Sequence, residues 1–126
     1  MSRTFAAIAA LTFIFASTAA SAQMLKTADT PKGKTFVDAK GMTLYIFDKD
    51  AGGKSTCNGP CAENWPPLAV AADAKPTADM TIVVRDDGKK MWAYKGKPLY
   101  TFKQDTAPGE TKGDGFLNGA WHMAKP

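Results

Sequence analysis

An internal duplication constrains this chain more than any other feature of its sequence. Residues 36–50 and residues 91–105 align without a gap, and Lys-Gly, Leu-Tyr, Phe and a final Asp recur at the same spacing in both copies. A duplicated structural unit produces such matches directly, whereas chance rarely does. A tryptophan follows each copy after a glycine-containing stretch, at Trp65 and at Trp121. We therefore expect two pseudo-equivalent halves that share one core.

Each copy has the pattern of a β-hairpin. Tyr45 and Phe47 stand two residues apart, as do Tyr100 and Phe102, so each pair projects from one face of an extended strand. The Lys-Gly pair before each strand supplies the positive φ that a hairpin turn needs. The sequence thus predicts a small, mainly β domain of two pseudo-repeated antiparallel hairpin units. Spacing alone does not distinguish a barrel from a sandwich.

A further hairpin precedes the second copy. Residues 80–85 and 89–94 are rich in β-forming residues and flank Asp86-Asp87-Gly88, a strong turn signal. Because this hairpin runs directly into the second copy, residues 80–102 are predicted to form a three-stranded antiparallel meander.

The remaining segments carry weaker signals. We expect at most one short helical turn, at residues 62–65, because Pro66 and Pro67 stop a helix there. Residues 27–34 are expected to be a loose arm before the first strand. Residues 69–78 are expected to be a surface linker between the halves.

The first 22 residues are typical of a cleavable export signal. Arg3 supplies a positive n-region, residues 5–15 an apolar h-region, and Ala20-Ser21-Ala22 an A-x-A cleavage site. The apolar stretch is shorter than the roughly 20 residues that a membrane-spanning helix needs. We expect a signal peptide (1–22) and one mature β-rich domain (23–126), soluble in the periplasm or outside the cell and without a membrane span.

Cys57 and Cys61 are the only cysteines, and export to an oxidising compartment favours a disulfide between them. A five-residue ring restricts the unfolded chain by only about 2 kcal/mol, so the bond pins a turn more than it stabilises the fold. The alternative is a redox-active pair. Thiol–disulfide enzymes usually carry C-x-x-C at the start of a helix in a βαβ setting, which a β meander does not offer.

His122 is the only histidine, which excludes multi-histidine metal sites and most general acid–base schemes. Met123 adjoins it, and an imidazole beside a thioether suits copper. A copper site at His122 and Met123 is therefore the one cofactor hypothesis that the residues leave open, and otherwise we expect no cofactor. The simpler interpretation is a local hydrogen bond of the imidazole.

Asp50 and Asp105 each stand three residues beyond a repeated phenylalanine, where a strand gives way to a glycine-containing loop. A carboxylate at such a position accepts backbone N–H bonds and holds the turn. One alternative is that the two carboxylates face one cation or ligand across the pseudo-symmetry axis. Another is that they form an acid–base pair on an unfamiliar β scaffold. No G-x-S-x-G, P-loop, H-E-x-x-H or Rossmann glycine pattern is present. We therefore expect a protein that is not an enzyme.

The distribution of lysines and arginines indicates which class of partner to expect. Lysines are scattered, and Arg85 is the only arginine after the signal segment. Nucleic-acid surfaces usually show clustered arginines or basic residues interleaved with aromatics. We expect no nucleic-acid partner, and instead an envelope protein or a small ligand, with the oligomeric state left open.

The motifs together resemble a known family. They are Tyr-x4-Asp at Tyr45 to Asp50 and at Tyr100 to Asp105, Cys57-x-x-x-Cys61-Ala62-x-x-Trp65-Pro66-Pro67-Leu68, and the late Trp121-His122. This combination resembles the secreted repeat family of predicted bacterial lipoproteins, for which no reaction is established. The chain lacks the lipid-attachment cysteine of many relatives, so tethering is not expected. The resemblance implies an exported periplasmic binding or interaction domain, with a copper-handling or redox accessory protein of the envelope as the alternative.

Overall fold

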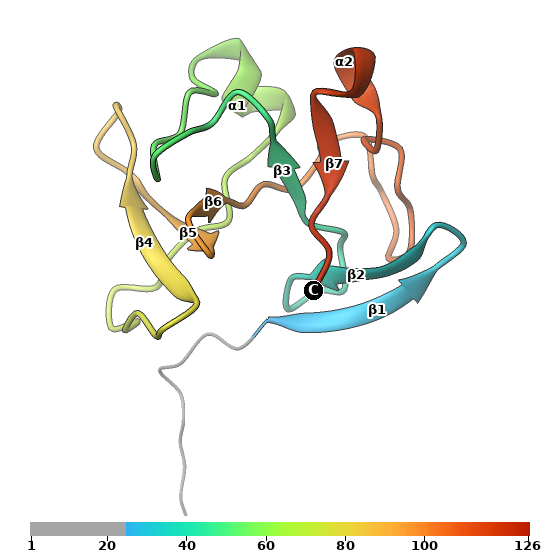
Figure 1. The fold of residues 1–126 in the computed structure, drawn as a ribbon, viewed down its shortest axis with the longest axis horizontal. Coiled ribbons are helices and arrows are strands. Elements are labelled where there is room, and N and C mark those ends of the chain that lie inside the picture. Colours follow the sequence, from blue (N-terminus) through green and yellow to red (C-terminus); the bar gives the residue numbers. More distant parts are fainter. Residues whose placement is uncertain (1–24) are drawn as a thin grey trace, which may run out of the picture.

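The computed structural model describes residues 25–126 (Figure 1), and the expected signal peptide lies outside the described residues. Short strands dominate this range, with two very short helices between them. In chain order the elements are β1 (Lys26–Thr30), β2 (Gly33–Val37), β3 (Tyr45–Phe47), α1 (Pro60–Asn64), β4 (Met80–Val84), β5 (Lys90–Tyr94), β6 (Lys97–Pro98), α2 (Phe116–Gly119) and β7 (Trp121–Met123).

The strands form three small antiparallel sheets. β1 pairs with β2, β3 pairs with β7, and β4, β5 and β6 form the predicted three-stranded meander in sequential order. The mainly β prediction is confirmed, but the sheets of residues 25–126 do not close into a barrel. No helix in the same range is long and apolar enough to cross a membrane.

The first sheet corrects one expectation. The segment predicted to be a loose arm is instead a hairpin, in which Ala28 pairs with Thr35 and Asp29 with Lys34. Pro31 and Gly33 are the turn signal that marked it. The hairpin buries Phe36 and Val37, so packing against the core holds a segment that looks polar when read alone.

Backbone hydrogen bonds show the correspondence between the two halves. The N–H of Leu44 donates to the carbonyl of Phe36, and the N–H of Leu99 donates to the carbonyl of Trp92 in the same way, each at 3.0 Å. The hairpin β1–β2 therefore corresponds to β4–β5. The two leucines are 55 residues apart, but Phe36 and Trp92 are 56 apart. The first turn thus holds one residue more than the gap-free alignment implies.

Element α2 corrects the expectation of at most one helical turn. It stands just before Trp121, as α1 stands just before Trp65, so the duplication extends to these elements. Leu117 and Asn118 have φ of 58°, in the left-handed region, and α2 is therefore a kinked turn rather than a regular helix. Gly115 precedes the element and Gly119 is its last residue, so local propensity would not predict a helix there.

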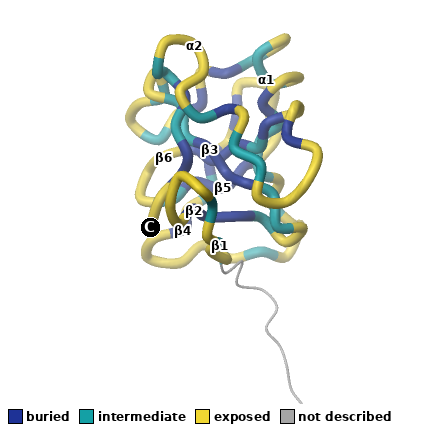
Figure 2. The backbone as a smooth tube through the Cα atoms, turned by 90° about the vertical axis from the view of Figure 1, so that its right-hand side faces the viewer, coloured by how far each residue is buried: buried dark blue, intermediate teal, exposed yellow. Residues whose placement is uncertain are grey.

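The core consists of two clusters that both draw on both halves. One is centred on Tyr45, Trp65, Tyr100 and Trp121, and the other on Trp92 with its neighbours Phe36, Leu44, Met80, Leu99 and Ala124. Figure 2 shows buried segments in the interior of the molecule and exposed segments around its periphery. At the centre, the N–H of each tyrosine donates to the carbonyl of the other, at 2.7 and 3.0 Å.

Candidate functional site

The repeated tyrosines and aspartates bond across the two copies of the motif. The hydroxyl of Tyr45 donates to Oδ2 of Asp105 at 2.6 Å, and the hydroxyl of Tyr100 donates to Oδ2 of Asp50 at 2.6 Å. Each tyrosine hydroxyl is thus hydrogen-bonded to the aspartate of the other copy of the motif. The sequence located all four residues, but their exchange of partners is a tertiary feature.

The second carboxylate oxygen of each aspartate accepts hydrogen bonds from the loop that follows it. Oδ1 of Asp50 accepts hydrogen bonds from the backbone N–H and the hydroxyl of Thr56, at 2.7 and 2.8 Å. Oδ1 of Asp105 accepts one from the backbone N–H of Lys112 at 2.9 Å. Both carboxylates therefore have both oxygens engaged, and each is bonded to a different tyrosine and a different loop.

The environment of the two tyrosines keeps them neutral. Both rings are fully buried. Burial, followed by the hydrogen bond to Asp105, raises the pKa of Tyr45 far above its usual value. Burial, followed by the hydrogen bond to Asp50, raises the pKa of Tyr100 in the same way. Both hydroxyls therefore remain protonated donors at any physiological pH.

Four parallel aromatic rings stack beside the tyrosines. Trp65 and Trp121 lie 3.7 Å apart with an interplanar angle of 2°. Phe102 stacks on Trp65 at 4.0 Å, and Phe47 stacks on Trp121 at 4.2 Å. Each phenylalanine thus also packs on the tryptophan of the other repeat. Stacked rings add specific geometry to a large buried apolar area, so the repeated Phe positions serve the core.

Gly113 shows how tightly this stack is enclosed. Its N–H donates to the hydroxyl of Tyr45 at 3.2 Å. A Cβ at this position would meet the ring of Trp65 at 2.6 and 2.8 Å. Because Trp65 is held between stacked neighbours, it has no room to move aside, and only glycine fits here.

On the Tyr100 side, a chain of hydrogen bonds leads to Arg85. The guanidinium Nη1 of Arg85 donates to Oγ of Ser55 at 2.7 Å, and Ser55 lies 2.7 Å from the hydroxyl of Tyr100. Tyr100 in turn donates to Asp50, so the serine donates to the tyrosine. The chain links a buried cation to a carboxylate through two neutral hydroxyls, which is the paired arrangement that a buried charge requires.

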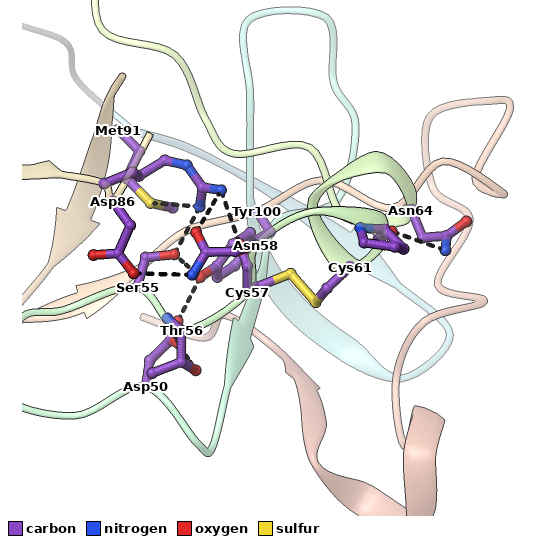
Figure 3. The surroundings of a disulfide bond; sticks show 12 residues. Asp50, Ser55, Thr56, Cys57, Asn58, Cys61, Asn64, Asp86, Met91 and Tyr100 are labelled. Atoms are coloured by element: carbon purple, nitrogen blue, oxygen red, sulfur yellow. Dashed lines mark hydrogen bonds between the residues drawn. A yellow bond between two sulfur atoms is a disulfide. The ribbon is translucent and has the colours of Figure 1, made fainter. Parts of the chain in front are cut away.

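Arg85 also holds the disulfide loop, whose surroundings are drawn in Figure 3. Cys57 and Cys61 are bonded at an S–S distance of 2.00 Å, as predicted. Nη2 of Arg85 donates to the carbonyl of Cys57 at 2.8 Å, and Nε lies 3.6 Å from a carboxylate oxygen of Asp87. The backbone N–H of Lys89, with Arg85 adding to it, lowers the pKa of Asp87. Sequence reasoning missed this role, although a lone arginine among many lysines was a signal.

His122 and Met123 lie on opposite sides of β7. Nε2 of His122 is 2.8 Å from Oδ2 of Asp48, and both side chains are about half exposed. Met123 is buried in the core cluster of Tyr45 and Trp65. Within residues 25–126, no group of three or more His, Cys, Asp or Glu side chains is placed to hold a metal ion. The copper hypothesis stays a prediction, with Asp48 as the group that the structure brings to His122.

A hollow of about 320 Å³ lies apart from the Tyr–Asp network. Its lining residues come from β3, from the β5–β6 turn and from the segment after β7: Ile46, Tyr94, Lys95, Lys97, Ala124, Lys125 and Pro126. This volume is at the lower end of the range for small-molecule sites. The sequence did not reveal the hollow, because Lys125 is distant in sequence from Lys95 and Lys97 and each lysine looks solvated on its own.

The comparison with protein families returns one finding. A family described as a secreted repeat of unknown function matches residues 26–69 and again residues 81–125. The two matches span most of the chain and coincide with the two halves related by hydrogen bonding. The chain therefore belongs to this family. Neither the curated proteins nor the solved structures that were compared include a match to the chain.

Proposed function

We propose that this member of the secreted repeat family is a non-enzymatic protein of the periplasm that binds a small ligand. One observation carries the proposal: the polar side chains shared by both repeats are bonded to one another inside the molecule, through Tyr45 with Asp105 and Tyr100 with Asp50. A general base needs a free lone pair within reach of a substrate. These groups therefore stabilise the fold, and we place the ligand-binding function on the surface of the molecule.

Export supports the periplasmic location. The matched family is a secreted one, and a disulfide such as Cys57–Cys61 persists in oxidising compartments such as the periplasm. The A-x-A pattern ending at Ala22 matches a cleavable signal. Fractionation of cells expressing the full chain tests this step: we expect the protein in the periplasmic fraction, shortened by residues 1–22. Retention of the full-length chain in the cytoplasm would refute it.

The hollow favours a small ligand over a protein partner. It is concave, and its volume of about 320 Å³ suits a molecule of modest size rather than a flat protein interface. Native mass spectrometry of the protein recovered from its periplasm tests the proposal. We expect a reproducible added mass that is lost on acid unfolding. If the mass is that of the bare chain, both as isolated and after incubation with a periplasmic small-molecule extract, the proposal is wrong.

The enzymatic alternative has a separate test. If Asp50 and Asp105 formed an acid–base pair, Asp50→Asn would abolish turnover of some substrate in a broad hydrolase and redox screen. We expect no turnover by the wild-type protein in such a screen. Turnover that is lost in Asp50→Asn, with the fold retained, would replace the binding proposal by the enzymatic one.

A further inference from the structure

We propose that the hollow between β3, the β5–β6 turn and the segment after β7 binds a small organic anion with an apolar body. This inference rests on the proposed function and names the ligand class. The lining combines three residues with apolar or aromatic side chains, Ile46, Tyr94 and Ala124, here called the floor, with three lysines, here called the rim. A ligand that uses the whole lining needs an anionic group for the lysines and an apolar group for Ile46, Tyr94 and Ala124.

The rim points to an anion. Lys95, Lys97 and Lys125 are among the residues that line the hollow, and no acidic side chain is among them. Within residues 25–126, none of the three ammonium groups forms an ion pair. Nζ of Lys125 donates to the carbonyl of Lys32, a neutral acceptor, at 3.3 Å. Like charges gathered around one concavity raise the local concentration of a counter-ion there.

The floor requires an apolar body. Tyr94 is half-buried and packs on Phe36 at 4.7 Å, and Nζ of Lys95 lies 5.3 Å from the centre of the Tyr94 ring. Ile46 and Ala124 belong to the same core cluster as this ring. An inorganic anion would leave these apolar surfaces in water, whereas a ring or short chain would bury them, which is favourable.

The first repeat serves as an internal reference for this site. By the hydrogen-bond correspondence, Tyr94 takes the place of Asp38, and Lys97 takes the place of Met42. In the first repeat Oδ1 of Asp38 accepts hydrogen bonds from the N–H groups of Lys40 and Met42, each at 2.9 Å, and so stabilises the turn. The second repeat closes its corresponding turn, which is one residue shorter, without that carboxylate. Closing a turn at these positions therefore requires neither the aromatic ring of Tyr94 nor the additional charge of Lys97.

The two turns also differ in how they are covered. A Cβ at Gly41 would meet Pro108 at 3.3 Å, so the first turn is packed under another loop. A Cβ at the corresponding Gly96 would meet nothing within 4 Å. The turn that carries the added aromatic and basic residues is thus the open one, which is what a binding site requires.

Three probes separate the parts of the proposed ligand. In NMR titrations of the processed protein, we expect phenyl phosphate to shift the signals of Tyr94, Lys97 and Ala124 with saturation at one equivalent. Inorganic phosphate tests the charge alone and phenol tests the ring alone, and each should bind at least about tenfold more weakly, because each lacks one group of contacts. Equal affinity for phenyl phosphate and inorganic phosphate, or no shifts at these residues, would overturn the proposal.

A matched pair of variants tests the site. Lys97→Gln with Lys125→Gln removes two charges from the rim, and Lys40→Gln with Lys49→Gln removes two exposed charges elsewhere. We expect the rim variant to weaken phenyl phosphate binding by about tenfold or more, because each charge-assisted hydrogen bond contributes strongly. The control variant should stay within about twofold of the wild type. Equal weakening in both variants would show a general charge effect and overturn the site.

The native mass measurement then distinguishes a failure of the proposed site from a failure of the proposed binding function. If the wild-type protein carries an added mass and the rim variant does not, the native ligand occupies the hollow. If both carry the same added mass, the proposed site is wrong and the binding function stands. If neither carries one, both as isolated and after incubation with a periplasmic small-molecule extract, the binding function itself fails.

Discussion

Tyr45 and Tyr100 bury hydroxyl groups that need hydrogen-bond partners inside the protein, because an unpartnered buried hydroxyl costs free energy. Each obtains an aspartate oxygen at 2.6 Å from the other half of the chain. A tyrosine–aspartate motif can therefore recur for a purely structural reason. A bond between a neutral donor and a carboxylate is among the stronger kinds of hydrogen bond in proteins.

The exchanged pairing predicts a specific pattern of energetic coupling. Tyr45→Phe leaves an oxygen of the buried Asp105 without its donor and should lower the free energy of unfolding by about 1–3 kcal/mol. A double-mutant cycle with Asp105→Asn should give a coupling energy above about 0.5 kcal/mol, measured by denaturant unfolding. The cycle of Tyr45→Phe with Asp50→Asn should be additive. Coupling in that second cycle and not in the first would contradict the exchange.

The raised tyrosine pKa values predict alkaline sensitivity. In the unfolded chain both hydroxyls lose their protons near pH 10, but in the folded protein they retain them at higher pH. Their contribution to stability is thus complete below about pH 10 and is lost as the pH rises from there toward the folded pKa values. The free energy of unfolding should fall by up to about 1.4 kcal/mol per pH unit for each tyrosine. Denaturant unfolding at a series of pH values measures this slope, and an identical slope in Tyr45→Phe would contradict the assignment.

At the scale of elements, α2 departs most from what local propensity allows. Leu117 has φ 58° and ψ 53°, and its side chain is 55% exposed. A left-handed backbone costs a residue with a Cβ about 1–2 kcal/mol. The turn persists because Phe116 packs on Trp65 and Phe102, and because the N–H of Gly115 donates to the carbonyl of Trp121 at 2.8 Å.

Relief of that strain should stabilise the protein. Leu117→Gly removes the Cβ that opposes the left-handed conformation, and we expect a gain of about 1 kcal/mol in the free energy of unfolding. Leu117→Ala is the control, because it removes the exposed apolar side chain but keeps the Cβ. It should leave stability nearly unchanged, as measured by thermal and denaturant unfolding. A gain of equal size in both variants would attribute the effect to the exposed leucine rather than to the backbone.

At the scale of the whole molecule, the two halves share their interior. The Trp65–Trp121 stack, both Tyr–Asp bonds and the paired backbones of Tyr45 and Tyr100 all join one half to the other. Each half alone would expose these aromatic rings and leave two buried polar groups without partners. A chain of about 50 residues with such a surface does not hold a core of its own.

The fragments 25–78 and 79–126 should therefore be unfolded in isolation. We expect each fragment to lack the near-ultraviolet circular dichroism of packed aromatic rings. An equimolar mixture should recover that signal in a concentration-dependent way, because folding and association are then one process. Cooperative unfolding of either fragment by itself would contradict a shared core.

Local patterns determined much of this protein from the sequence alone. The Asp-Asp-Gly turn after residue 85, the alternation of Tyr45 and Phe47, and the spacing of Cys57 and Cys61 report on neighbouring residues, and the structure contains the meander, the β fold and the disulfide that they predict. Where local signals were weak, as in the β1–β2 hairpin and the left-handed turn of α2, the sequence misled, because packing against the core holds both segments.

Only the tertiary structure decided which residues meet. Tyr45 and Asp105 are 60 residues apart, and Ser55 and Arg85 are 30 apart. The lysine-rimmed hollow likewise gathers Lys97 and Lys125 from distant segments. The duplication showed that two equivalent tyrosine–aspartate sets exist, but each tyrosine had an aspartate in its own copy as an equally plausible partner. The docking of one half against the other selects between them, because the two tyrosine backbones pair at the centre and each side chain then reaches into the opposite half.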